Sequence, residues 1–325
     1  MSQDLSVGDV LHAPKRSERL RQRAAWMYFV EEMTQSAIAE ALGVGRVTVV
    51  RMLAEAKALG EVRIALSRGG AELGGLEAAL CKLHGFSEAI VAPLSSASAD
   101  PTAPIGAALG DHVSALLRND MKIGLGWGRT LNRSLEYLHE RSLRGLHVVS
   151  LVGGVTHFAQ DNPVEFPSAF AHAFNAECYL IPAPALVDSP ATKAALIERC
   201  GLGAVYDFAR ALDAVVVSVG TLEPEATVAR LALIGEAERK ALREYGGVGE
   251  LLCNVFDREG RIVDHPLNER VMSVPLEAVR AAPVRVLAAG GAHKLAAIDG
   301  AIKLLKPTTL VTDLATARRL TEGGR

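Results

Sequence analysis

Two glycine-rich clusters have the residue types that bind an anion such as a phosphate. The first is GLGWGRT, from Gly124 to Thr130, and the second is AAGGAHK, from Ala288 to Lys294. Each follows a predicted strand and precedes a predicted helix, where backbone N–H groups and the helix dipole attract negative charge. The first cluster is not a Walker A loop, because it lacks the Gly-Lys-Ser/Thr ending, and it departs from GxGxxG spacing.

These clusters predict a phosphate site built from Gly126, Gly128, Thr130, Gly290, Gly291 and Lys294. A third pair, Gly153 and Gly154, ends another predicted strand and is expected to line the same crevice, because parallel sheets bind ligands at the carboxyl ends of their strands. An ordinary strand-to-helix turn fits the first cluster alone nearly as well. A position on the surface is also the commonest one for a lysine.

Carboxylates add candidates for binding sugar hydroxyls. These are Glu250 in GVGE and Asp257 in FDREG, although an exposed turn is the default position for Asp257. The nine histidines show no pair at metal-ligand spacing on one helix, so no metal is expected. No Ser, His and Asp set stands out either, and the sequence predicts neither a catalytic residue nor a cofactor.

The segment QSAIAEALGVGRVTVVRML, from Gln35 to Leu53, has the pattern of a helix-turn-helix. Thr34 suits the cap of its first helix, Ala39 is small enough for two helices to approach, and Gly43 suits the turn. Such a motif docks its second helix in the major groove of DNA. The residues predicted to contact DNA are Gln35, Arg46, Val47, Thr48, Val50 and Arg51. An ordinary helical hairpin with a solvated arginine face is the alternative.

The charge of the chain is distributed unevenly and suggests two domains. Residues 15–68 carry ten Lys or Arg against six Glu, a charge of +4, whereas the remaining 25 basic and 31 acidic residues give −6. We therefore assign 1–66 to a helix-turn-helix DNA-binding domain, the glycine-rich 67–75 to a linker, and 76–325 to a second domain. In the first domain we expect helices at 17–30, 35–42 and 46–59 and a short strand at 62–66.

Beyond residue 76 short apolar runs alternate with helical stretches, which predicts a doubly wound, mostly parallel α/β domain. The strands of such a sheet are covered on both faces, which explains why they read as continuous apolar runs. The expected strands lie at 89–91, 122–125, 147–152, 179–181, 214–219, 284–288 and 309–311, and the expected helices at 76–84, 105–117, 131–141, 193–199 and 295–305. Asp257 to Gly260 is predicted to form a hairpin turn within 251–263.

The composition excludes several classes of protein. With 49% hydrophobic and 22% charged residues the chain is globular and not disordered. No run is long and apolar enough to span a bilayer, and the N-terminus lacks the pattern of a signal peptide. The four cysteines are scattered, which is typical of reduced, buried thiols. These features predict a cytoplasmic protein.

The helix-turn-helix segment TQSAIAEALGVGRVTVVRMLAEAKALGEVRI resembles that of the SorC-type, or DeoR-like, sugar-binding transcriptional regulators. The resemblance continues, in family order, through IGLGWGRTL, VVSLVGG, LIPAPALVDS, GGVGELLCNVFDREGRIVDH and LAAGGAHKLAAIDGAIKLLKPTTLVTDLATARRL. It covers nearly the whole chain, from about Arg21 to Leu320. The last segment is the most specific.

The resemblance implies a second domain with the sugar-phosphate isomerase fold. In this family that domain binds a phosphorylated sugar or related effector that modulates operator binding, usually within a tetramer. Residue by residue, the resemblance implies Gly126, Gly128, Arg129 and Thr130 at the effector, Lys294 on its phosphate and Glu250 on its hydroxyls. The second helix departs from the family at Gly45 and Val50, where serines are frequent, so its operator should differ.

The sequence thus predicts a DNA-binding transcriptional regulator of a carbohydrate or polyol operon, modulated by a sugar phosphate or polyol. The expected assembly is at least a dimer and by resemblance a tetramer, because one recognition helix makes few base contacts. An isomerase or aldolase on the same fold is the alternative. Ribose-phosphate isomerases carry an acidic DGADE-like run where Ala214 to Gly220 reads AVVVSVG, so the carboxylate that abstracts a proton is missing there.

Overall fold

The computed structural model describes residues 16–62, 71–96, 99–155 and 162–322. The chain divides into two compact units, Met1–Ser67 and Arg68–Arg325. The predicted short strand at 62–66 lies, apart from Val62, outside the described residues.

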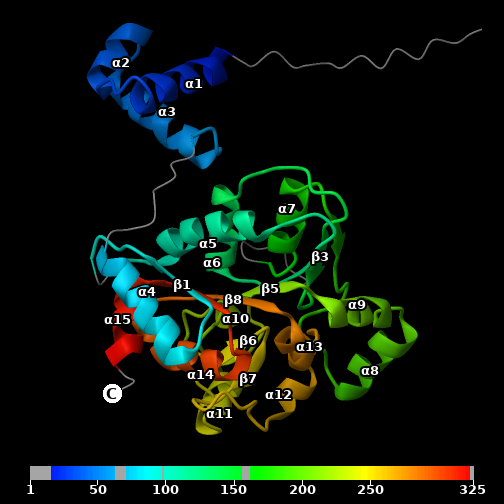
Figure 1. Cartoon of the computed structure of the whole chain (residues 1–325). Coiled ribbons are helices and arrows are strands. Elements are labelled where there is room, and N and C mark those ends of the chain that lie inside the picture. The colour runs from blue at the N-terminus through cyan, green and yellow to red at the C-terminus, as the bar shows by residue number, and fades with distance from the viewer. Residues whose placement is uncertain (1–15, 63–70, 97–98, 156–161, 323–325) are drawn as a thin grey trace, which may run out of the picture. The chain divides into compact units, whose positions relative to one another are not determined.

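The first unit consists, in its described part, of helices α1 (Arg16–Phe29), α2 (Gln35–Leu42) and α3 (Arg46–Ala58) (Figure 1). The Thr34 hydroxyl accepts a hydrogen bond from the Ala37 N–H at 3.2 Å and so caps α2. Gly43 ends α2 in the left-handed region, at φ +64°. The predicted helices are therefore confirmed to within one residue at each end.

A small apolar core holds these helices together. It contains Ala24, Ala25, Met27, Ile38, Ala39, Val49, Leu53 and Ala56. The Arg21 guanidinium adds a polar tie, because it donates to Glu61 at 2.6 and 2.7 Å and to Glu55 at 3.0 Å. This ion pair joins α1 to α3 and to the segment that follows it.

The second unit is built on a seven-stranded parallel sheet in the order β1-β9-β8-β5-β2-β3-β4. Its strands are β1 (Glu88–Ala92), β2 (Lys122–Leu125), β3 (His147–Ser150), β4 (Glu177–Tyr179), β5 (Ala214–Val217), β8 (Val284–Ala288) and β9 (Thr309–Asp313). Each predicted strand is present, although several boundaries differ by a few residues. The chain leaves β2 toward β4 and returns to β5 on the other side of β2. The sheet order thus reverses between β2 and β5, where ligands bind in such sheets.

Helices cover both faces of this sheet (Figure 1). One face is covered by α5 (Thr102–Leu116), α6 (Arg129–Ser134) and α7 (Glu165–Ala173), and the other by α4 (Ala71–His84), α13 (Leu276–Ala281), α14 (Leu295–Leu305) and α15 (Leu314–Glu322). In α5 the buried Ile105, Leu109 and Val113 recur every four residues and face the strands. The two apolar layers form separate clusters, as expected for a doubly wound fold.

Shorter elements complete the unit. They are α8 (Pro190–Arg199), α9 (Gly203–Phe208), α10 (Thr227–Arg230), α11 (Glu236–Glu244), α12 (Pro266–Glu269), the 3₁₀ turns Leu135–Tyr137, Ala209–Ala211 and Ala292–Lys294, and the antiparallel pair β6 (Gly249–Leu251) and β7 (Asn254–Phe256). Among the described residues no helix is long and apolar enough to cross a membrane.

Three predictions need correction. Helix α4 begins at Ala71, so part of the expected linker 67–75 is helical. The helix expected at 131–141 spans only Arg129–Ser134 before a 3₁₀ turn. Cys178 and Cys200 are exposed and not buried. The predicted turn at 257–260 is confirmed, because it brings Ile262 back to pair antiparallel with Phe256. A tighter turn that was not predicted, at Leu252 and Cys253 with φ +53° and +65°, joins β6 to β7.

Candidate functional site

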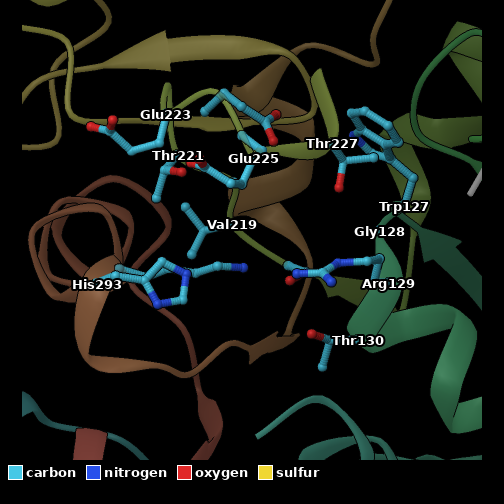
Figure 2. Close-up of a pocket in the computed structure, with 15 residues that line it drawn as sticks. Trp127, Gly128, Arg129, Thr130, Val219, Thr221, Glu223, Glu225, Thr227 and His293 are labelled. Carbon is cyan, nitrogen blue, oxygen red and sulfur yellow. The ribbon is translucent and has the colours of Figure 1, made fainter. Parts of the chain in front are cut away.

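A cavity of about 460 Å³ lies at the carboxyl ends of β2, β5 and β8, which are neighbours in the sheet (Figure 2). Its position at the reversal of strand order is the one expected for a ligand site in this fold. It is lined by Trp127, Gly128, Arg129, Thr130, Ser218, Val219, Gly220, Thr221, Glu223, Glu225, Ala226, Thr227, Glu250, His293 and Lys294.

The loop after β2 supplies one wall. Gly128 has φ +124°, a conformation that favours glycine, and the chain then enters α6. Arg129 is exposed and reaches from α6 toward the opposite wall, where His293 lies (Figure 2). Thr130 is buried beside it. Gly126 does not line the cavity, and a Cβ added to it would meet Leu252 and Val217 at 3.2 and 3.3 Å.

The loop after β8 supplies the facing cation. Lys294 and His293 line the cavity, whereas Gly290 and Gly291 form the turn that precedes them. Burial and the nearby Arg129 lower the pKa of Lys294. Burial, Lys294 and Arg129 likewise lower the pKa of His293. Because burial and mutual repulsion disfavour the charged forms of these groups, a bound anion would stabilise those charged forms.

Glu250 forms the buried acidic part of the site. It lies at the centre of β6, and its main chain pairs with that of Gly220 through hydrogen bonds of 3.0 and 3.1 Å. Its Oε2 accepts a hydrogen bond from the Cys253 N–H at 2.8 Å. Burial raises the pKa of Glu250 to about 7, although Lys294 and this hydrogen bond act in the opposite direction. The carboxyl group can therefore take up or release a proton near neutral pH.

A third wall, which sequence reasoning missed, follows β5. It contributes Ser218, Val219, Gly220, Thr221, Glu223, Glu225, Ala226 and Thr227. Figure 2 shows Thr221, Glu223 and Glu225 gathered on one side of the cavity. The signal was present, because this segment follows a predicted strand of the same parallel sheet and begins with a glycine-containing run.

Six of the predicted effector-binding residues do not line this cavity. They are Gly126, Gly290 and Gly291, described above, and Gly153, Gly154 and Asp257. Gly153 lies against another segment, since an added Cβ would meet the Ala183 carbonyl oxygen at 2.4 Å, and Gly154 forms a bridge with Pro184. The strand order explains this, because β2 separates β3 from β5. Asp257 lies in the second turn, where it accepts hydrogen bonds from the main chain of Glu259 and Arg261. Gly153 and Gly154 therefore do not line the crevice as predicted, and Asp257 has the turn position that was its default.

The surface of the first unit carries the residues predicted to contact DNA. On α3, Arg46, Val47, Val50 and Arg51 are exposed and Thr48 is half-buried. Val47 is 83% exposed, whereas Val49 is fully buried in the core. Gln35, at the start of α2, is half-buried. The helix therefore presents these side chains outward, and their contact with DNA stays a prediction. In the described part of the chain no cluster of His, Cys, Asp and Glu could hold a metal ion.

Comparisons with known proteins agree with this architecture. Residues 70–322 match the family described as "Putative sugar-binding domain". The erythritol catabolism regulatory protein EryD of Brucella abortus is 30% identical over 310 residues, which cover 93% of this chain and 96% of that protein. The deoxyribonucleoside regulator of Bacillus subtilis is 28% identical over 308 residues, 94% of this chain and 98% of that protein.

A solved structure supports the same relationship. The full-length sorbitol operon regulator SorC from Klebsiella pneumoniae has a TM-score of 0.70 and 27% sequence identity, and the match covers 93% of this chain and 98% of that one. It therefore spans both units of the chain. The chain belongs to the SorC-type family of sugar-binding transcriptional regulators.

Proposed function

We propose that this protein is a DNA-binding transcriptional regulator of a carbohydrate or polyol catabolic operon and acts in the cytoplasm. Its operator affinity changes when a phosphorylated sugar or related small effector occupies the cavity of the second unit. The names of the relatives support this assignment, since they are regulators of erythritol catabolism, of deoxyribonucleosides and of a sorbitol operon.

The observation that carries the effector assignment is the chemistry of the cavity walls. Arg129 and Lys294 supply two cations for a phosphate. Glu223, Glu225 and Glu250 supply acceptors for sugar hydroxyls, and threonine hydroxyls can donate or accept. A molecule with an anionic end and several hydroxyl groups complements both. A volume of about 460 Å³ also lies within the range of small-molecule sites.

The DNA-binding assignment rests on the first unit. The α3 residues Arg46, Val47, Thr48, Val50 and Arg51 are of types that can read bases, and Gln35 at the start of α2 can bond a phosphate. One such helix contacts few bases, so the protein should act as a dimer or a dimer of dimers with half-sites about 34 Å, or a multiple, apart. Light scattering tests the assembly, and a monomeric mass with and without DNA would contradict it.

The effector hypothesis is tested by a thermal-shift screen of sugar phosphates and free polyols, followed by DNA titration. A ligand at 100 times its Kd adds about 2.7 kcal/mol to the free energy of unfolding, which gives a clear rise in Tm. A true effector should then change operator affinity by about 5- to 150-fold. If no compound raises Tm, or if the compound that does so leaves operator affinity unchanged, the hypothesis fails.

An enzyme remains the second candidate because of Glu250 and Lys294. The pKa of Glu250 is raised to about 7, where a general base works well, and the pKa of Lys294 is lowered, which favours a nucleophilic amine. A role in binding explains the presence of Glu250 and Lys294 equally well and requires no catalysed reaction. Incubating the purified protein with the effector separates the two, because conversion to product at a measurable rate would support the enzyme.

A further inference from the structure

The turn that carries Lys294 is fastened by a buried carboxyl group outside the cavity. Asp313 is the last residue of β9, the neighbour of β8, and is fully buried. Its Oδ2 accepts hydrogen bonds from the Gly291 N–H at 2.8 Å and from the Thr316 hydroxyl at 2.6 Å. Its Oδ1 accepts the Thr316 N–H at 2.9 Å. One carboxyl group thus joins the start of α15 to the turn after β8.

Thr316 takes part in the same contact. It is fully buried in the first turn of α15, and its Oγ1 lies 2.9 Å from the Gly291 N–H, which therefore points at both Asp313 and Thr316. We call these two residues the α15 latch. Gly290 packs closely against the latch, because a Cβ added there would lie 2.1 Å from Asp313 Oδ2.

The latch acts on the backbone that leads to Lys294. The Ala289 N–H is bonded to the Val311 carbonyl at 3.0 Å, and the Lys294 N–H to the Gly291 carbonyl at 2.9 Å. Gly291 lies between these two bonds at φ +105°. The position of the 3₁₀ turn Ala292–Lys294 therefore depends on how Gly291 is held.

Lys294 has little else to fix its direction. Within the described ranges it forms no ion pair of 4 Å or less, and its neighbours act on it only through longer-range charge. A long, flexible side chain without a salt bridge takes its starting direction from its backbone. Neither Asp313 nor Thr316 is among the residues that line the cavity.

We propose that Asp313 and Thr316 are positioning residues of the effector cavity, which hold the Gly290–Gly291 turn so that Lys294 faces the phosphate of the effector. This inference rests on the proposed function for its ligand, but the positioning of Lys294 can be measured without any ligand. The latch holds Lys294 in place before the effector binds. It therefore reduces the conformational entropy that Lys294 loses on binding and increases effector affinity.

The test compares Thr316→Val with Thr316→Ser in the full-length protein. Valine keeps the size of threonine and removes the hydroxyl, whereas serine keeps the hydroxyl. The matched control is Thr312→Val, because Thr312 is also fully buried on this side of the fold and its hydroxyl has no hydrogen-bond partner among the described residues. Removing an unpaired hydroxyl should cost nothing.

The first readout needs no ligand. It is the pKa of Lys294, obtained from the pH dependence of its acylation as detected by mass spectrometry. In the wild type this pKa lies below the ordinary lysine value. It should rise toward that value in Thr316→Val and stay unchanged in Thr316→Ser and Thr312→Val. A lysine whose pKa is the same in all four proteins would overturn the latch.

The second readout is the Kd for inorganic phosphate by calorimetry. We expect at least a fivefold increase in Thr316→Val and less than a twofold change in the other two variants. If phosphate does not bind even the wild type while the Lys294 pKa moves as expected, the latch stands and the proposed phosphate site fails. If phosphate binds all four proteins equally, the latch is wrong and the proposed function is unaffected.

Discussion

The residues predicted to contact DNA differ in environment from Glu250 and Lys294 of the effector cavity. On α3 the predicted DNA-contacting side chains are exposed or half-buried, and Val47 is 83% exposed. In the effector cavity burial raises the pKa of Glu250 and lowers those of Lys294 and His293. DNA is a large polyanion and can be met by solvated charges, each of which adds little and is screened by salt. A small ligand offers few contacts, so desolvated groups such as Glu250 contribute more per contact than exposed ones.

Because of this difference, we expect substitutions in the two units to affect different properties of the protein. Substitutions on the exposed face of α3 should change DNA affinity and leave folding unchanged. Substitutions in the cavity should change effector affinity and also the pH dependence of stability, because the folded and unfolded states there bind protons differently.

The largest effect is expected for Lys294→Met. Lys294 is half-buried, and losing a cation that pairs with an anion in such a site costs about 2 kcal/mol or more, roughly 30-fold in effector affinity. Effector response should disappear at wild-type concentrations while effector-free DNA binding persists. Titrating the DNA complex with effector measures both properties. Lys240→Met, at an exposed position of α11, serves as the control. A normal response in Lys294→Met would remove the lysine from the site.

Glu250→Gln should change the pH dependence of stability. Its pKa is 4.5 in the unfolded chain and about 7 in the folded one, so between these values the folded state holds a proton that the unfolded state has released. The free energy of unfolding should therefore fall as pH rises from 4.5 to 7, by about 3 kcal/mol, and level off above. Glutamine should abolish this contribution, as measured by urea denaturation at pH 5 and pH 7.5.

The exposed glutamate Glu244, at the end of α11, provides the comparison for that experiment. Glu244→Gln removes the same charge but should keep the wild-type pH dependence. An equal fall of stability with pH in wild type, Glu244→Gln and Glu250→Gln would show that Glu250 ionises normally in the folded protein.

A smaller effect is expected on the other unit from Arg46→Ala. If Arg46 reads a base, its removal costs about 1 to 3 kcal/mol of operator affinity and relaxes specificity at one position. The unfolding transition should not move. Gel-shift titration at fixed salt measures the change, with Arg144→Ala as a control, since Arg144 is an exposed arginine of the second unit. Equal losses in both variants would mean that only net charge matters.

Much of this arrangement could be predicted from the sequence. The strands of the sheet were readable because each is a continuous apolar run, and the walls after β2 and β8 were readable because glycines mark them. The wall after β5 was missed because Ser218 to Thr227 has a single glycine and no periodic pattern. Gly153 and Gly154 were misplaced because strand order is set by long-range packing, which local sequence does not encode.

One local prediction failed, and one turn was missed, for energetic reasons. Gly74 and Gly75 suggested a linker, yet both lie in α4, where a glycine costs about 1 kcal/mol relative to alanine. The burial of Leu73 and Leu80 compensates for that cost. The turn at the Asp257 segment was predicted correctly because its residues favour turns. The tighter turn at Leu252 and Cys253 was missed, because the burial of these two residues outweighs their left-handed backbone.

The smallest expected effect belongs to Thr34→Ala and tests whether the exposed face of the first unit depends on local order. The alanine removes the acceptor for the Ala37 N–H and should cost about 1 kcal/mol of α2 stability, whereas Thr34→Ser should restore it. In the full-length protein the amides of α2 should then exchange hydrogen roughly fivefold faster, while those of α14 stay unchanged. Operator affinity should fall slightly, because α2 supports α3, and phosphate affinity should stay the same. Faster exchange in both helices would mean that the two units unfold together and that the contrast between them is not one of independent stability.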